Sequence, residues 1–172
     1  MTQVEPEFGR VHDRETVVRA TSLRDGYIDP SLPIQTVSIG VAFTMVPLRG
    51  LEVMRRLHVD LVRASEYLQQ SGGSKFFYFV TREAVDPTAR LHARMLFYNG
   101  EDPATGSAAG CAAAWMVAHG VAQSDERVLI EQGVEMQRAS RIFVRASRLD
   151  NGVVNVRVGG NAVEVLRGEL VF

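Results

Sequence analysis

The sequence predicts an α+β protein in which a curved, mixed or antiparallel sheet wraps around a central buried helix. Three observations lead to this fold class. The tract 106–119 consists mostly of alanine, and no charged side chain stands between Asp102 and Asp125. The last third of the chain alternates apolar and polar residues, as strands with one buried face do. The segment 51–68 instead repeats apolar residues at steps of three and four, which is the pattern of a helix.

Length and composition indicate one domain with a sizeable core. A chain of 172 residues buries enough surface to fold without disulfides. We therefore expect a single domain over residues 1–172, in which residues 1–33 form a loop that leads into the fold and one short helix near 13–23. The chain carries 19 basic and 20 acidic residues. This balance disfavours nucleic acid and anionic membranes as partners.

The single cysteine, Cys111, excludes an intrachain disulfide and the thiolate clusters that hold structural zinc. A reducing, cytoplasmic location fits this cysteine usage. Neither a signal peptide nor an apolar run of about 20 residues is evident, so no membrane span is expected.

The first half of the chain after residue 33 predicts strands followed by helices. Segment 34–48 is rich in β-branched residues, and Gly40 interrupts it, which leaves open two strands or one strand bent by a bulge. The helical region that begins at residue 51 ends at Gly72 and can be divided into two helices near Asp60.

Strands are predicted on both sides of the alanine tract. Segments 75–81 and 91–98 enclose a polar turn. After the tract, the alternating segments predict a meander of antiparallel strands that continues to the end of the chain. These segments are 127–133, 141–147, 153–160 and 161–172.

The alanine tract predicts a helix without a solvent face, because alanine has the highest helix propensity and no stripe of the tract is polar. Trp115 and Met116 are expected to fill its wider end, and Gly120 to stop it. Asp102, Thr105 and Ser107 are suitable capping residues at its start.

Two interpretations of the start of this helix remain open. In one, the polar residues only cap a buried helix. In the other, the backbone donors near Gly106 and Ser107, at the positive end of the helix dipole, bind the carboxylate of a ligand.

Other catalytic motifs do not fit. GEDPATGS lacks the spacing and the lysine of a phosphate-binding loop. Asp102, Ser107 and His119 are residue types of a hydrolytic triad, but the serine and histidine would lie about 18 Å apart along one helix. Cys111 is expected to pack inside the helix rather than to react.

No metal site is predicted. The histidines outside the alanine tract lie in different predicted elements without paired ligand spacing, so we expect them on the surface or on strands. These residues are His12, His58 and His92.

Several motifs resemble the PhzF-like phenazine-biosynthesis isomerase family. EDPATGSAAG, preceded by ARM and followed by IEQGVEMQRAS and VGGNAVEV, is similar to its sequences, and so is VSIGVAFTMVPL. The resemblance covers nearly the whole chain but only the carboxy-terminal lobe of a family member. It implies a diaminopimelate-epimerase-like fold, in which each of two lobes wraps a sheet around a helix that points into a shared cleft.

The resemblance also implies a chemistry. The family's best understood activity is a cofactor-independent isomerisation of a dihydro-hydroxyanthranilate by proton transfer. A glutamate of the amino-terminal lobe is the main acid and base, and the motif's aspartate and serine assist it. Carried over, Asp102 and Ser107 are catalytic, and Thr105 and Gly106 bind substrate. No cofactor or metal is implied.

The chain departs from the family pattern in two places near the expected cleft. The loop before Glu101 is shorter than is usual, and Gln137 and Ala139 stand where glycine and proline are expected. Glu66, on an amphipathic segment, is interpreted as a surface residue and not as the missing glutamate.

The sequence leaves three functional hypotheses. The first is one lobe of a PhzF-like isomerase or epimerase that acts on a small carboxylate-bearing metabolite, with its cleft completed by a copy of itself, as a homodimer, or by a complementing amino-terminal lobe. The second is a non-catalytic small-anion binding or regulatory module. The third is a truncated gene product, because the start of the chain is similar to the middle of a longer family sequence.

Overall fold

The computed structural model describes residues 1–97, 100–150, 152–169 and 171. Over these residues nine strands form one sheet in the order β1-β2-β3-β4-β5-β7-β8-β9, and β6 pairs with β5. The strands are β1 (Glu7–His12), β2 (Ile34–Ser38), β3 (Ala42–Pro47), β4 (Phe76–Thr81), β5 (Leu91–Phe97), β6 (Gly100–Asp102), β7 (Val128–Gln132), β8 (Ser140–Leu149) and β9 (Gly152–Gly159). The helices are α1 (Arg14–Thr21), α2 (Leu51–Arg55), α3 (Leu61–Gln70) and α4 (Gly106–Ala118).

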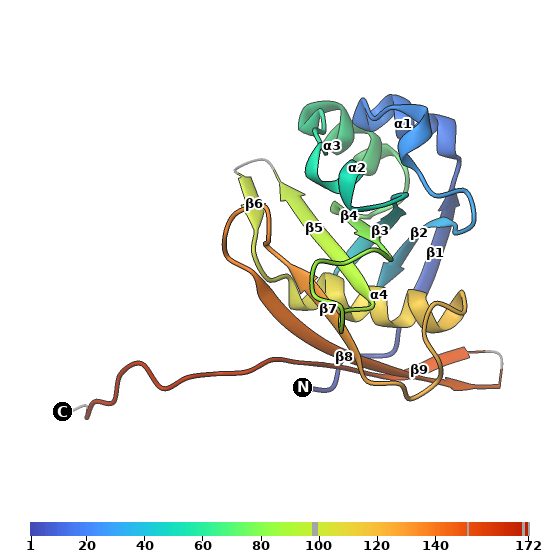
Figure 1. The fold of residues 1–172 in the computed structure, drawn as a ribbon. Coiled ribbons are helices and arrows are strands. Elements are labelled where there is room, and N and C mark those ends of the chain that lie inside the picture. The colour runs from blue at the N-terminus through green and yellow to red at the C-terminus, as the bar shows by residue number, and fades with distance from the viewer. Residues whose placement is uncertain (98–99, 151, 170, 172) are drawn as a thin grey trace.

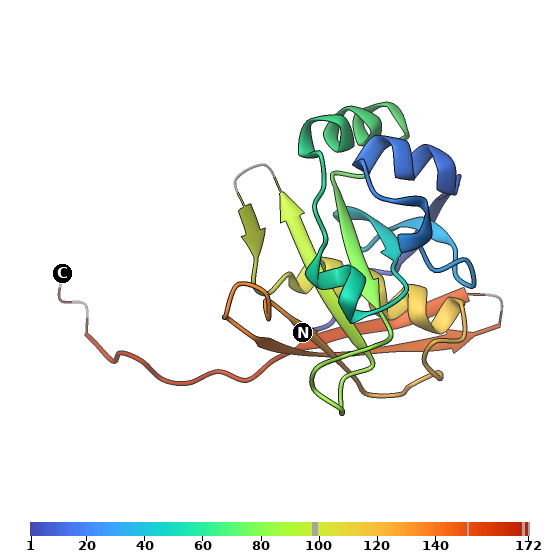
Figure 2. The same cartoon turned by 45° about the horizontal axis from the view of Figure 1, so that its top comes forward.

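The sheet is mixed and curls around α4, while α1, α2 and α3 cover its outer side (Figures 1 and 2). Strands β3 and β4 are parallel, as are β5 and β7, and the other neighbours are antiparallel. This arrangement confirms the predicted α+β class and the sheet wrapped around a helix. The predicted antiparallel arrangement after the alanine tract is confirmed for β7, β8 and β9.

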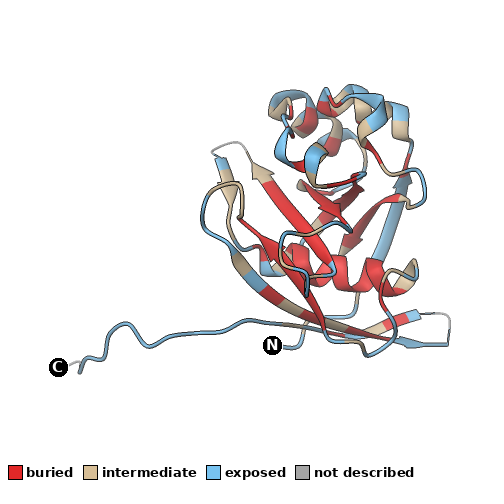
Figure 3. Ribbon diagram, in the orientation of Figure 1, coloured by how far each residue is buried: buried red, intermediate tan, exposed pale blue. Residues whose placement is uncertain are grey.

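Helix α4 is enclosed on all sides, as its composition predicts. Every residue from Ala108 to Val117 is buried (Figure 3). Its small side chains let the strands approach closely: a methyl group at Gly110 would collide with the side chain of Ile39. Trp115 is fully buried near the end of the helix. Gly120 then adopts a φ of 72°, the left-handed conformation that ends the helix.

Two short helices replace one long one in the region 51–70, because Asp60 begins a new helix. Its side chain accepts a hydrogen bond from the backbone N–H of Arg63 at 3.1 Å, and Asp13 caps α1 in the same way. The apolar faces of these helices pack on the outer face of the sheet in a second core cluster. That cluster contains Val17, Leu23, Ile28, Ile34, Val46, Leu48, Met54, Leu57, Val59, Ala64, Leu68, Phe77 and Phe79.

The expectation that residues 1–33 form only a loop and one short helix is wrong for residues 7–12. Strand β1 begins at Glu7 and pairs with β2. Thr2 forms an isolated bridge with Arg157 of β9, so this segment contacts both ends of the strand order. The segment carries no alternation of its own, and pairing with distant strands determines its conformation.

The observed ends of the other strands differ in detail from the predicted segments in three places. Segment 34–48 forms two strands joined through Gly40, which has a φ of 113°. In the predicted strand 91–98, Tyr98 lies outside the described residues, and the strand is observed to Phe97. Residues 161–169 pair with no strand and are exposed, so the predicted meander ends at Gly159. Residues 170 and 172 lie outside the described part of the chain.

Candidate functional site

The turn between β6 and α4 holds Asp102 in a network of hydrogen bonds. One carboxylate oxygen accepts from the backbone N–H of Ala104 at 3.2 Å, and the other accepts from the hydroxyl of Thr105 at 2.7 Å. Asp102 is half-buried. Its carboxylate is therefore fixed beside the start of the helix.

The first turn of α4 has no side-chain cap. Thr105 occupies the N-cap position, but its hydroxyl donates to Asp102 and accepts no hydrogen bond from the helix. The expectation that Asp102, Thr105 and Ser107 cap the helix is thus wrong: two of them bond to each other. The first N–H groups of any α-helix have no hydrogen-bond acceptor within the helix. The N–H groups of Gly106, Ser107 and Ala108 remain at the positive end of the dipole.

This uncapped turn borders an open cavity of about 900 Å³. Gly106 and Ser107 line the cavity, whereas Asp102 and Thr105, which precede them in the sequence, are not among its lining residues. The structure therefore brings two of the four predicted site residues to the cavity wall. The other lining residues are Met1, Gln3, Ala104, Ser140, Arg141, Ile142, Val158, Gly159, Gly160 and Asn161.

Gln132 at the end of β7 fixes this turn, and the sequence does not predict that role. Its Nε2 donates to the carbonyl of Asp102 at 2.6 Å and to the hydroxyl of Thr105 at 2.9 Å. Its Oε1 accepts from the backbone N–H of Thr105 at 3.3 Å and from the hydroxyl of Tyr78 at 2.8 Å. Gln132 and Tyr78 are both fully buried. Burial raises the pKa of Tyr78, helped by the negative charge of Asp102, so its hydroxyl stays protonated and donates.

Gly133, the next residue, lets the same turn pack closely. Its φ is 79°, and a Cβ there would lie 2.9 Å from the Cα of Pro103 and 2.5 Å from the carbonyl oxygen of Arg138. A side chain would push the Pro103 turn away from β7. The sequence offers only a weak signal for this pair, a polar residue followed by a glycine where the strand ends.

A buried charge cluster lies on neighbouring strands. His92 Nδ1 is 2.6 Å from Glu131 and its Nε2 is 2.9 Å from Glu135. Arg94 donates two hydrogen bonds to Glu101 at 2.9 and 2.7 Å, which ties β5 to β6 just before the Asp102 turn. Sequence reasoning placed His92 on a strand or the surface; it is on β5 but completely buried.

The protonation of this cluster follows from its geometry. Burial acts to lower the pKa of His92, but hydrogen bonds and charge attraction from Glu135 and Glu131 outweigh burial and raise it. The pKa of Glu135 is lowered: burial opposes the ionised form, and the hydrogen bond and charge of His92 overcome that effect. His92 is thus a charged link between two carboxylates.

The remaining candidate side chains lie away from the cavity. His12 is buried between Tyr67 and Thr36, and burial lowers its pKa to about 4, with a further contribution from Arg10. Burial raises the pKa of Cys111 to about 12, in agreement with a packing role.

Within the described ranges, His, Cys, Asp and Glu form no group of three or more that could hold a metal ion. Over the same ranges, none of the helices has the length and apolar character needed to cross a membrane.

Solved structures of other proteins share this fold. A curled sheet around a helix is also found in a Bacillus anthracis phenazine biosynthesis protein of the PhzF family, with a TM-score of 0.83 and 23% identity over 100% of this chain and 60% of that one. A predicted epimerase from Pseudomonas aeruginosa matches with a TM-score of 0.72 and 31% identity, over 98% of this chain and 58% of that one. The fold is therefore that of epimerase-like and isomerase-like α+β proteins.

The family follows from the sequence match. The family model described as phenazine biosynthesis-like protein matches residues 3–168, so this chain belongs to that family. An uncharacterized isomerase of Mesorhizobium japonicum is 36% identical over 140 residues, which are 77% of this chain and 46% of the relative. The trans-2,3-dihydro-3-hydroxyanthranilate isomerase of Pseudomonas chlororaphis is 30% identical, over 86% of this chain and 51% of the relative. The chain spans about half the length of these curated relatives.

Proposed function

We propose that this chain is one lobe of a PhzF-family isomerase or epimerase that moves a proton on a small carboxylate-bearing metabolite without a cofactor. In this proposal a second chain completes the cleft, either as a copy of this chain or as a complementing amino-terminal lobe. The observation that carries the proposal is the uncapped start of α4, which opens into a cavity of about 900 Å³ beside a fixed Asp102.

The start of α4 supplies groups that suit a carboxylate. The first-turn N–H groups are unpaired within the helix and carry the positive end of its dipole. The hydroxyl of Ser107 stands at the same cavity wall. Together they would hold the substrate carboxylate, and Asp102 in the adjacent turn would orient polar groups of the substrate and assist proton transfer.

The lining of the cavity supports the need for a second chain. Among the described residues that line it, none is an aspartate, glutamate, histidine, cysteine or lysine. A proton transfer needs a base within about 3 Å of the proton that moves. That base would come from the opposite wall of a completed cleft.

The same lining favours a second candidate function, a small-anion binding or regulatory module without catalysis. The two functions differ in one observable. An isomerase exchanges a substrate proton with solvent, whereas a binding module holds the ligand without exchange.

Proton exchange tests the proposal. We would incubate the chain in D₂O with trans-2,3-dihydro-3-hydroxyanthranilate, follow deuterium incorporation by NMR, and measure the oligomeric mass by light scattering at the same concentrations. The proposal predicts exchange that grows with the oligomer fraction and falls about 100-fold in Asp102→Asn, in the range of one acid or base catalyst. Asp25→Asn, on the exposed surface, is the matched control.

Two outcomes count against the isomerase. Ligand binding without exchange by an oligomer of this chain contradicts the isomerase completed by its own copy and favours the binding module. A chain that stays monomeric and does not bind the ligand contradicts both functions.

A further inference from the structure

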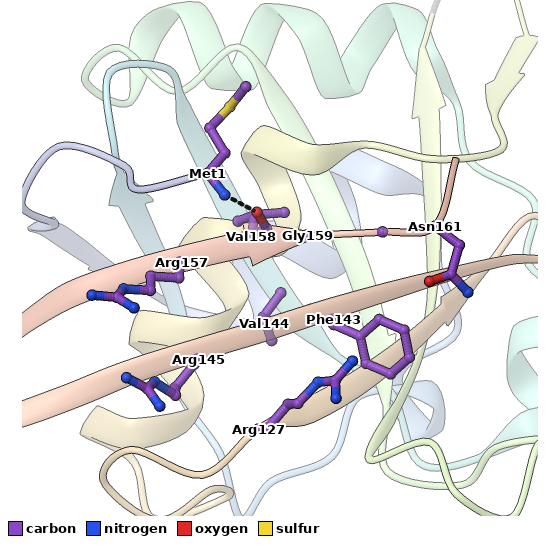
Figure 4. Close-up of a pocket in the computed structure, with 10 residues that line it drawn as sticks. Met1, Arg127, Phe143, Val144, Arg145, Arg157, Val158, Gly159 and Asn161 are labelled. Carbon is purple, nitrogen blue, oxygen red and sulfur yellow. Dashed lines mark hydrogen bonds between the residues drawn. The ribbon is translucent and has the colours of Figure 1, made fainter. Parts of the chain in front are cut away.

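A second hollow lies on the β8–β9 hairpin, next to the cavity at the start of α4. It has a volume of about 330 Å³, and three arginines, Arg127, Arg145 and Arg157, line it together with Phe143 (Figure 4). Alternation along the strands explains the arrangement: Val144 and Val156 belong to the core around α4, so their neighbours point outward.

Two of these arginines stand directly opposite each other. Arg145 of β8 and Arg157 of β9 are partners in the antiparallel register. Figure 4 shows their side chains next to each other on the same face. Like charges at directly opposite positions destabilise a strand pair. This pairing therefore costs stability in the free protein.

Carboxylates compensate the charge of the pair only in part. The Nε of Arg145 lies 3.7 Å from Asp125, whose same oxygen already accepts a hydrogen bond from Ser147. In the described part of the chain, neither Arg157 nor Arg127 forms an ion pair with a carboxylate. Among the described residues, Asp125 is thus the one carboxylate that pairs with any of the three arginines, and it pairs with Arg145 alone.

Phe143 and Gly159 form a further part of the wall of the hollow. The guanidinium carbon of Arg127 lies 4.1 Å from the centre of the Phe143 ring, a cation–π contact that holds the cation against β8. Across from Phe143 in the register is Gly159, and a Cβ there would meet nothing within 4 Å. The space at Gly159 is therefore open.

We propose that this face is a binding site for the phosphate group of a small phosphate monoester, held by Arg145 and Arg157 from two strands. A dianion between the two guanidinium groups replaces their repulsion with attraction, and the planar guanidinium fork matches phosphate oxygens. The organic part of the ligand lies toward Arg127 and Phe143. This hollow adjoins the cavity at α4 and shares Met1 and residues 158–161 with it, but the arginines that would hold the phosphate line only the hollow, apart from the helix start on which the proposed function rests.

Calorimetric titration with inorganic phosphate and with phenyl phosphate, at constant ionic strength, tests the site. Both probes should bind the full chain, and phenyl phosphate should bind more tightly because its ring reaches Phe143. Arg157→Gln should weaken both affinities about tenfold or more, because a charge-assisted hydrogen bond is lost. Arg167→Gln, an exposed arginine in the extended segment after β9, is the matched control and should bind both probes normally.

Thermal unfolding without ligand distinguishes the site from a loss of folding. Arg157→Gln should melt at the same temperature as the wild-type chain or higher, because the opposed charge is removed, and its melting should no longer respond to phosphate. Equal affinity of wild type and Arg157→Gln would overturn the proposal. So would the absence of any response of the wild-type chain to either probe at millimolar concentration.

Discussion

Gln132→Glu tests whether the buried amide organises the helix start. The substitution keeps the shape of the side chain but removes both N–H donors. The hydrogen bonds to the carbonyl of Asp102 at 2.6 Å and to the hydroxyl of Thr105 at 2.9 Å are then lost. At about 1–1.5 kcal/mol for each bond, the loss is about 2–3 kcal/mol of unfolding free energy at neutral pH.

The pH dependence sharpens this prediction. Gln132 is completely buried, so a glutamate there would have a raised pKa in the folded protein. The protonated side chain of the Gln132→Glu variant can still donate one of the two hydrogen bonds. The destabilisation should therefore be smaller near pH 5, and it should grow as pH rises, because the buried acid must then ionise in the folded state. Urea unfolding of Gln132→Glu and of the wild-type chain at pH 5 and at pH 8 measures this change in unfolding free energy.

Gln69→Glu is the matched control, because Gln69 is exposed on α3. It should change the unfolding free energy by less than about 0.5 kcal/mol at either pH. If Gln132→Glu were as stable as this control at pH 8, the amide would not hold the turn and our account of the helix start would be wrong.

Two further substitutions probe the support of the site. Gly133→Ala should cost about 2 kcal/mol or more, since its φ is positive and its Cβ would press on Pro103, whereas Gly72→Ala, which has a positive φ but open space, should cost about 1 kcal/mol in the same urea assay. Equal losses at the two glycines would refute the close packing. The pKa of His92 is raised in the folded protein, so protonated His92 contributes to the unfolding free energy. This contribution is fully present below about pH 6.5, the pKa of the unfolded state, and is lost as pH rises through the folded-state pKa. His92→Gln should flatten this dependence in unfolding curves, and an unchanged slope would contradict the charged link.

The central helix could be predicted because the cause lies within one short segment. An alanine tract without a polar stripe has no surface to present to water, whatever surrounds it. The break at Asp60 was equally local, since a capping carboxylate acts on a residue three positions later. Such features depend on neighbours in sequence.

Features that depend on distant partners were missed. Strand β1 forms because β2 offers it a pairing edge, and its own residues show no alternation. Gln132 bonds to residues 27, 30 and 54 positions away, so nothing within its own strand indicates these partners. The sequence predicts that the hydroxyl of Thr105 caps the helix, but the hydroxyl donates a hydrogen bond to Asp102 instead.

The proposed function depends most directly on the claim that the uncapped first turn of α4 binds a carboxylate. Amide NMR of the full chain, titrated with 2-aminobenzoate as a small aromatic carboxylate, tests this most directly. We predict saturable shifts that are largest for the backbone N–H groups of Gly106, Ser107 and Ala108, and absent when 2-aminobenzamide replaces the acid. No shift at these three amides, or equal shifts with the neutral amide, would contradict the claim.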